Sequence, residues 1–354
     1  MDNGPMKHKE YGSDFNYPID SRWYLNDSAD TFFSSTEVSL FFSGRSALYH
    51  LLSHGIASFN WKEVYLPSYY CHEVYRFLEH LDIGVHYYNF NPLYDNIIDK
   101  DDIPDRPDCV LVNVSFFGME PADTRDFDRS VIIDDISHNL VAYTMSNAHY
   151  CFASLRKELP VPVGGFCYSP KGHSLPKGKQ NRKASILAER KMEAMGLKYQ
   201  YLQSAHEDKS GYRNIFANAE VKFEETYTQA VMPETAVKIL LKLDIEALLL
   251  QKQKNLNQAL NILKDVKALT LLGNPNNAPT FGLVLNCITH EKRDALKKHL
   301  VHNNIFPAIL WPDQNAGRDK MLENNMLFIH TDFRHDAQDI TFITNTIKTF
   351  YSDE

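Results

Sequence analysis

The sequence predicts an α/β protein built around a mostly parallel β-sheet. Short apolar runs rich in Val, Ile, Tyr and Phe recur along the chain, and helix-like segments separate them. Apolar runs of this kind are typical of strands that are covered on both faces, and alternation with helices is typical of parallel sheets. The composition is that of a globular protein, with 354 residues, 44% of them hydrophobic and 23% charged.

The first two thirds of the chain supply most of these elements. Each predicted strand is bounded by turn residues or by the start of a helix. The predicted strands are residues 38–42, 63–67, 84–90, 109–117, 130–135 and 148–154, and the predicted helices between the first of them are 43–55 and 71–81.

The last third begins with a helical pattern over residues 233–264, as one long helix or two joined ones, and Pro233 suits a helix start. A strand, helix, strand, helix series follows at 279–288, 291–305, 326–333 and 337–351, which predicts a smaller C-terminal α/β domain. We therefore predict three parts: an N-terminal arm (1–35), a large domain (36–235) and a small domain with a linking helix (236–354).

Charge and cysteine content narrow the class of protein. A net charge of −8 and a pI near 6.0 argue against a nucleic-acid partner. No apolar stretch approaches the length of about 18 residues that a membrane helix needs. The five cysteines are odd in number and show no C-x-x-C spacing, so we expect reduced thiols in a cytoplasmic protein, without a disulfide framework or a metal site.

Ligands of open parallel sheets bind beyond the carboxyl ends of the strands, so the residues that follow each strand are the candidates for function. After the first strand comes Ser43-Gly44-Arg45-Ser46, a glycine turn that runs into a helix. The amide groups at a helix start bind anions, and Gly44 permits close approach, so this turn is a candidate phosphate site. The same residues are also typical of an ordinary helix cap.

A second candidate is the pair Asp135 and His138 in "IIDDISHNL". A buried aspartate facing a pyridine nitrogen would keep that nitrogen protonated, which is what pyridoxal phosphate (PLP) needs to act as an electron sink. The alternative is a capping aspartate and a solvent-facing histidine.

A third candidate is Lys157 in "FASLRKELPVPVGG". A lysine at the mouth of a dry cleft has a lowered pKa, and a neutral amine forms a Schiff base with an aldehyde. Ser154 is placed to reach a phosphate. The alternative is a surface lysine paired with Glu158. After the strand at 63–67, Tyr70, Cys71 and His72 are candidates for contact with a cofactor ring.

Taken in order, these segments resemble the fold-type I PLP-dependent enzymes, and among them the DegT/DnrJ sugar aminotransferases. The resemblance covers nearly the whole chain. It is carried by "FFSGRSALYHLL", "EVYLPSYYC", "VNVSFFGM", "VIIDDISH", "FASLRKELPVPVGG", "GYRNIFANAE" and "FIHTDFRHDAQDI". It implies a large domain with a seven-stranded, mostly parallel sheet, a small C-terminal domain and a homodimer with shared active sites.

The resemblance also implies roles for single residues. Lys157 would form the Schiff base with PLP, Asp135 would pair with the pyridine nitrogen, and His138 would contact the phenolic oxygen. Further cofactor contacts would come from Gly44, Arg45, Ser46, Tyr70, Cys71 and Ser154. The predicted substrate contacts are Tyr212, Arg213, His330 and Arg334, with the first two reaching the neighbouring subunit's site.

The chain departs from the family pattern in four places, which mark a divergent branch. Lys157 lies three residues after Ser154 where the family has Ser-Phe-x-x-x-Lys, and Val-Gly-Gly replaces Gly-Glu-Gly-Gly. Cys71 stands where an aromatic residue is usual, and Arg45 where a small residue is usual.

The implied reaction is transfer of an amino group from an amino-acid donor to a keto acceptor. If that acceptor is a nucleotide-linked keto-sugar, the basic stretch Lys171 to Lys183 would contact its diphosphate. Two alternatives stay open: another PLP-dependent reaction on amino acids (lyase, decarboxylase or condensing enzyme), and a non-catalytic relative that binds a ligand or a partner.

Overall fold

The computed structural model describes most of the chain. The residues described are 9–18, 25, 33, 37–95, 97–204, 208–223, 230–273, 281–315 and 317–352. The chain divides into two compact units. The first unit comprises Met1–Lys9, Asp14–Asn60 and Ala142–Ala247, and the second comprises Glu10–Ser13, Trp61–Val141 and Leu248–Glu354. Most of the predicted arm (1–35) lies outside the described residues, and the predicted domain boundaries stay a prediction.

The predicted seven-stranded, mostly parallel sheet is present, with the strand order β1-β7-β6-β5-β4-β2-β3. Strands β2, β3, β4 and β5 pair in parallel, whereas β7 is antiparallel to both β1 and β6. The strands are β1 (Val38–Phe41), β2 (Glu63–Pro67), β3 (Gly84–Tyr88), β4 (Cys109–Val114), β5 (Val131–Asp135), β6 (Tyr150–Ser154) and β7 (Gly165–Tyr168).

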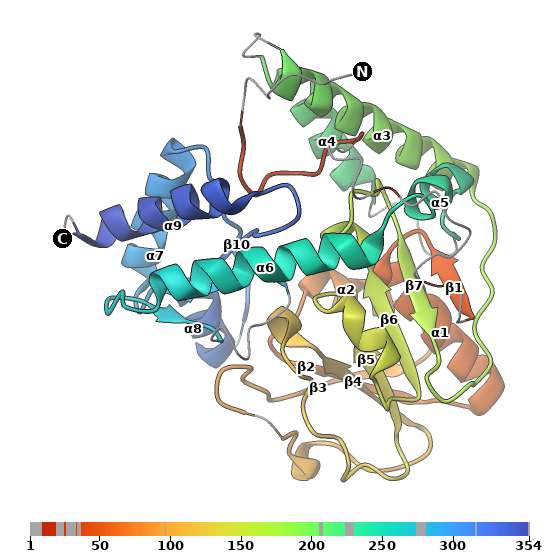
Figure 1. Cartoon of the computed structure of the whole chain (residues 1–354). Helices are drawn as coiled ribbons and strands as arrows, with labels where there is room; N and C mark the ends of the chain where they lie inside the picture. The colour runs from red at the N-terminus through yellow and green to blue at the C-terminus, as the bar shows by residue number, and fades with distance from the viewer. Residues whose placement is uncertain are drawn as a thin grey trace. The chain divides into compact units, whose positions relative to one another are not determined.

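The first unit holds β1, β6 and β7 together with α1, α3, α4 and α5 (Figure 1). Helix α1 packs on β6 and β7 and buries Ala47, Leu48, Leu51 and Leu52, a stripe with helical spacing. Helices α3 and α4 lie side by side. The helices are α1 (Gly44–Phe59), α3 (Arg182–Gln203), α4 (Ser210–Phe223) and α5 (Glu234–Leu240).

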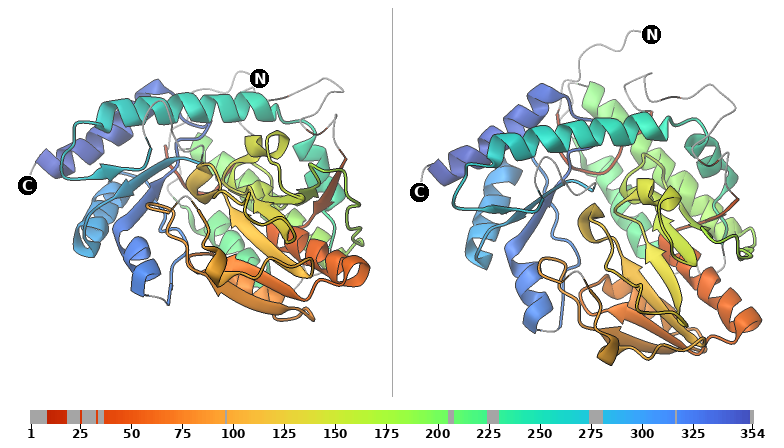
Figure 2. Two further views of the ribbon diagram at one scale, coloured as in Figure 1. Left: turned by 90° about the horizontal axis from the view of Figure 1, so that it is seen from below. Right: turned by 60° about the horizontal axis from the view of Figure 1, so that its bottom comes forward.

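The second unit holds the parallel strands β2 to β5 and a three-stranded antiparallel sheet of order β10-β9-β8. Figure 2 shows the parallel strands from two further directions. All six side chains of β4 are buried, which explains its unbroken apolar run "CVLVNV" except for Asn113, whose amide donates to the carbonyl of Ala122 at 2.9 Å.

The remaining elements complete the second unit. Helix α6 begins in the first unit and continues into the second, where Leu256, Leu260 and Leu263 join the core of the small antiparallel sheet. The elements are α2 (His72–Leu78), α6 (Ile245–Leu263), β8 (Thr270–Leu271), β9 (Leu283–Asn286), α7 (His290–His302), α8 (Gly317–Asn325), β10 (Met326–Ile329) and α9 (Ala337–Ser352).

The predicted and observed elements agree in order, with a few differences. The helical pattern over 233–264 is two helices, α5 and α6, because a short break at 241–244 separates them. Strand β7 was not predicted, since the prolines and glycines before it indicated a loop. Among the described residues, no helix is long and apolar enough to cross a membrane.

Candidate active site

The start of α1 and the end of β6 meet within the first unit. Ser43 caps α1, and its hydroxyl oxygen accepts the N–H of Ser46 at 3.1 Å. A Cβ on Gly44 would lie 2.9 Å from the Cβ of Ser154, and a Cβ on Gly165 would lie 2.3 Å from the carbonyl carbon of Ser43. Glycine is therefore required at both positions, and the predicted phosphate residues Gly44, Ser46 and Ser154 lie together at a helix start.

Lys157 lies three residues after Ser154, at the end of the 3-10 turn Leu155–Lys157 that Ser154 precedes. Its side chain is half-buried. Ser154 pairs with Gly165, and Ser43 bridges to Gly164, so the turn with Lys157 and the start of α1 lie at the same end of these strands. The structure thus brings the predicted Schiff-base lysine and the predicted phosphate site together.

A charged cluster on α4 supports the turn that carries Lys157. Glu220 accepts from Arg156 at 3.1 Å and from Lys191 at 2.5 Å, and both cations lie over the ring of Phe223. Burial and the nearby Arg156 lower the pKa of Lys191 to about 8, although Glu220 opposes this shift. Sequence reasoning missed Glu220 and Lys191, because nothing local to Arg156 indicates its partners.

Arg45, Tyr212 and Arg213 complete the predicted residues of the first unit. The Arg45 guanidinium lies 5.6 Å from the ring centre of Phe223, on the same cluster. Tyr212 is buried against Tyr201 between α3 and α4, whereas Arg213 is exposed. The predicted contact of Tyr212 and Arg213 with a second subunit stays a prediction.

Lys171 begins the basic loop and lies away from Lys157. The loop leaves β7 at Tyr168, which pairs with Cys151 near the start of β6, whereas Lys157 follows the end of β6. Lys171 approaches His149 to 3.4 Å there. The predicted contact of the stretch Lys171 to Lys183 with the diphosphate of an acceptor stays a prediction.

In the second unit, Asp135 ends β5 and is buried. The hydroxyl of Tyr70 donates to one carboxylate oxygen of Asp135, and the N–H of Ser137 donates to the other at 2.9 Å. Because β2, β4 and β5 run in parallel, their carboxyl ends lie along one edge, which brings Tyr70 and Asp135 together across 65 residues of sequence.

His138 lies in an aromatic cluster that the sequence did not indicate. Its ring stacks on Phe281, with ring centres 3.9 Å apart, and on Trp311, with centres 5.2 Å apart. Its Nδ1 accepts the N–H of Phe117 at 3.3 Å, so the neutral ring carries its proton on Nε2. Phe117 and Trp311 both have a positive φ, near 57° and 50°, a strained backbone typical of functional sites.

Cys71, at the position where the family has an aromatic residue, is half-buried and precedes α2. An aromatic ring does approach this segment, but it belongs to Trp311. The ring centres of Trp311 and Tyr70 lie 5.8 Å apart. Trp311 and Phe281 lie far along the chain from the strand ends, so no local spacing could have identified them.

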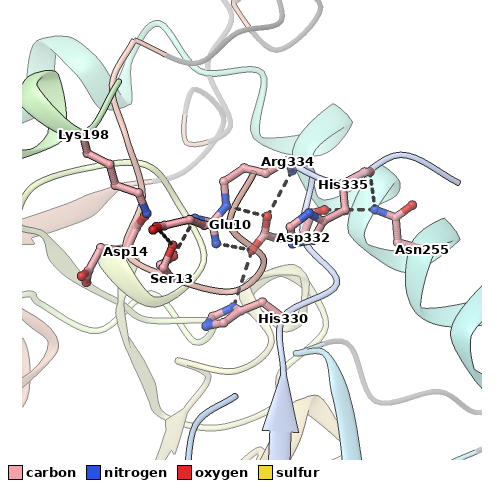
Figure 3. A network of polar contacts seen from close by, with 9 residues as sticks. All are labelled: Glu10, Ser13, Asp14, Lys198, Asn255, His330, Asp332, Arg334 and His335. Carbon is pink, nitrogen blue, oxygen red and sulfur yellow. Dashed lines mark hydrogen bonds and ion pairs between the residues drawn. The ribbon is translucent and has the colours of Figure 1, made fainter. Parts of the chain in front are cut away.

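His330 and Arg334 form a separate network (Figure 3). Arg334 donates to both carboxylate oxygens of the buried Asp332, at 2.9 and 2.7 Å, and to the carbonyl of Ser13 at 2.6 Å. His330 Nδ1 lies 3.5 Å from Asp332. Arg334 thus binds groups of its own unit, and the predicted substrate role of both residues stays a prediction.

The network predicts a pH dependence of stability. Burial lowers the pKa of His330 from 6.5 to about 4, so the folded protein keeps this ring neutral where the unfolded chain protonates it. We expect the free energy of unfolding to fall by about 2–3 kcal/mol as the pH drops from 6.5 to 4. Asp332, whose pKa is also lowered by Arg334, adds a further loss at more acidic pH.

Urea unfolding at several pH values measures this effect. His330→Gln should flatten the curve between pH 6.5 and 4, whereas the exposed His302→Gln should leave its slope unchanged. An equal slope in wild type and His330→Gln would show that His330 titrates normally in the folded protein.

Comparison with known proteins tests the fold. No family model matches the sequence, and no curated protein matches it. Spr1654 of Streptococcus pneumoniae, assigned as a sugar aminotransferase and solved with PLP, superposes with a TM-score of 0.63 at 14% identity, over 97% of this chain and 99% of that one. The chain has the fold of this aminotransferase.

Two further structures agree with that result. A DegT DnrJ EryC1 StrS aminotransferase from Brucella abortus gives a TM-score of 0.56 at 14% identity, over 90% of this chain and 87% of that one. The E. coli GDP-4-keto-6-deoxy-D-mannose-3-dehydratase with bound hydrated PLP gives 0.57 at 12% identity, over 88% of each chain. The predicted PLP-transferase fold is thereby confirmed.

Each unit, taken by itself, carries groups that fit a part of PLP. The first unit offers a helix start and hydroxyl groups for a phosphate, followed by a half-buried lysine. The second offers a buried carboxylate for the ring nitrogen. Beside it, Ser115 donates its N–H to the carbonyl of Asp135, and its buried hydroxyl has no hydrogen-bond partner within the described parts of the chain. A polar group of a bound ring would satisfy such a hydroxyl.

Proposed function

We propose that this protein is a PLP-dependent aminotransferase that transfers an amino group from an amino-acid donor to a keto acceptor. One observation carries the proposal: on an aminotransferase fold, β5 ends in a buried carboxylate, Asp135, and β6 is followed by Lys157 beside a helix start. Asp135 offers a carboxylate for a protonated ring nitrogen, Lys157 offers an amine, and the helix start offers an anion site. These are the three groups that PLP chemistry needs from a protein.

Each residue has a distinct task. The amides at the start of α1, with Ser46 and Ser154, bind the phosphate and fix the position of the cofactor. Asp135 holds a proton on the ring nitrogen by charge pairing. Lys157 would hold the cofactor through its aldehyde, and its amine would move a proton at the α-carbon of the donor as a general base. Bound PLP itself supplies the electron sink.

The proposal extends to the acceptor and the assembly. Among the solved structures of similar fold, one is described as a sugar aminotransferase and another as a GDP-4-keto-6-deoxy-D-mannose-3-dehydratase, which supports a nucleotide-linked keto-sugar as acceptor. The family resemblance supports a homodimer with shared sites. The five free cysteines, four of them buried, support a cytoplasmic location.

A half-reaction separates transamination from the alternatives. Purified protein with PLP should show a visible absorbance band that disappears when glutamate is added and returns when a 2-oxo acid is added. A band that persists while carbon dioxide or ammonia is released would assign a different PLP reaction. Folded protein that shows no visible band with PLP would contradict the proposal altogether.

A further inference from the structure

The hydrogen bond between Tyr70 and Asp135 is not part of the cofactor-binding roles that the proposed function assigns. The Tyr70 side chain is 2% exposed, and its hydroxyl donates to the Asp135 carboxylate. Burial and the nearby Asp135 raise the pKa of Tyr70 well above its usual value of 10, so the phenol stays protonated and acts as a donor.

Tyr70 is itself held on two sides. The amide of Gln314, a buried residue, donates to the carbonyl of Tyr70 at 2.9 Å and to that of Trp311 at 3.0 Å. The ring of Trp311 lies 5.8 Å from the ring of Tyr70. These contacts fix the phenol in place, so its hydroxyl has little freedom to leave Asp135.

The carboxylate keeps capacity for another donor. Its two oxygens offer about four acceptor positions, and Tyr70 and Ser137 use one on each oxygen. A carboxylate that is oriented by two donors in a dry site is prepared to accept a pyridinium N–H without rearrangement.

We infer that Tyr70 is a positioning residue that orients the Asp135 carboxylate toward the ring nitrogen of the cofactor. This inference rests on the proposed function, because it concerns the same site. Tyr70 acts through Asp135, so its effect should depend on the presence of a ring nitrogen in the ligand.

Tyr70→Phe, which removes only the hydroxyl, tests this dependence. The dissociation constant for PLP should rise by about tenfold, since hydrogen bonds to charged groups are strong. The visible band of the variant should also shift in its pH dependence. With a carbocyclic PLP analogue, in which C–H replaces the ring nitrogen, wild type and Tyr70→Phe should bind equally well.

Tyr75→Phe is the matched control. Tyr75 is also a buried tyrosine of this segment, but its hydroxyl donates to the backbone carbonyl of Pro67 at 2.5 Å. It should bind PLP as the wild type does. In an Asp135→Asn background, Tyr70→Phe should add little further loss. Melting temperatures of all variants separate a loss of binding from a loss of folding.

The outcomes distinguish this inference from the proposed function. If wild type binds PLP and Tyr70→Phe binds it equally well, or if the variant loses affinity equally for PLP and the carbocyclic analogue, the positioning role is wrong while the proposed function stands. If wild type itself shows no band with PLP, the proposed function fails first.

Discussion

Lys157→Ala is expected to lower kcat for transamination by at least about 10⁴-fold, because this residue both binds the aldehyde and moves the proton. The variant should also lose the visible band that the wild type shows with PLP. It should still bind PLP non-covalently, since the start of α1, Ser46 and Ser154 are unchanged. Steady-state kinetics and absorbance spectra of purified protein measure both effects.

Lys238→Ala is a suitable control for this substitution. Lys238 is an exposed lysine of the same unit, paired at 2.7 Å with Glu234 on α5. It should retain wild-type activity. A kcat of Lys157→Ala within about tenfold of wild type would show that another group performs the proton transfer.

Arg334→Met is expected to lower the free energy of unfolding by about 3–5 kcal/mol, because it leaves the buried carboxylate of Asp332 without its main partner. Methionine retains most of the apolar stem, so lost packing contributes little. Urea unfolding measures the change. The exposed pair Arg190–Glu193 provides the control, since Arg190→Met should cost less than about 1 kcal/mol.

A second substitution tests the cause of that loss. Replacing Asp332 with leucine in the Arg334→Met variant removes the unpaired charge and should recover most of the lost stability. If Arg334→Met instead keeps wild-type stability and raises only KM for a substrate, Arg334 is a substrate residue and its pairing with Asp332 is incidental.

Much of the fold followed from local sequence signals. Strands buried on both faces give unbroken apolar runs, so β2, β4, β5 and β6 were evident from the sequence. Their ends carry polar residues, so Asp135 and Lys157 could be named as candidates. The glycine turn at Gly44 was informative because only glycine fits where α1 meets Ser154.

The remaining features depend on contacts that no local pattern encodes. Tyr70 meets Asp135 through strand pairing, and Trp311 reaches His138 from the other end of the chain. The family resemblance implied a substrate role for Arg334, and nothing in the local sequence indicated its ion pair with the buried Asp332. Strand β7 was missed because Gly165 at its start serves close packing against Ser43 rather than a turn.

Trapping the bound cofactor tests the central claim most directly. Borohydride reduction of the protein loaded with PLP, followed by peptide mass spectrometry, locates the lysine that held the aldehyde. The account predicts a phosphopyridoxyl group on the peptide that contains Lys157. Modification of a different lysine, such as the buried Lys191 with its pKa of about 8, or of none at all, would contradict it.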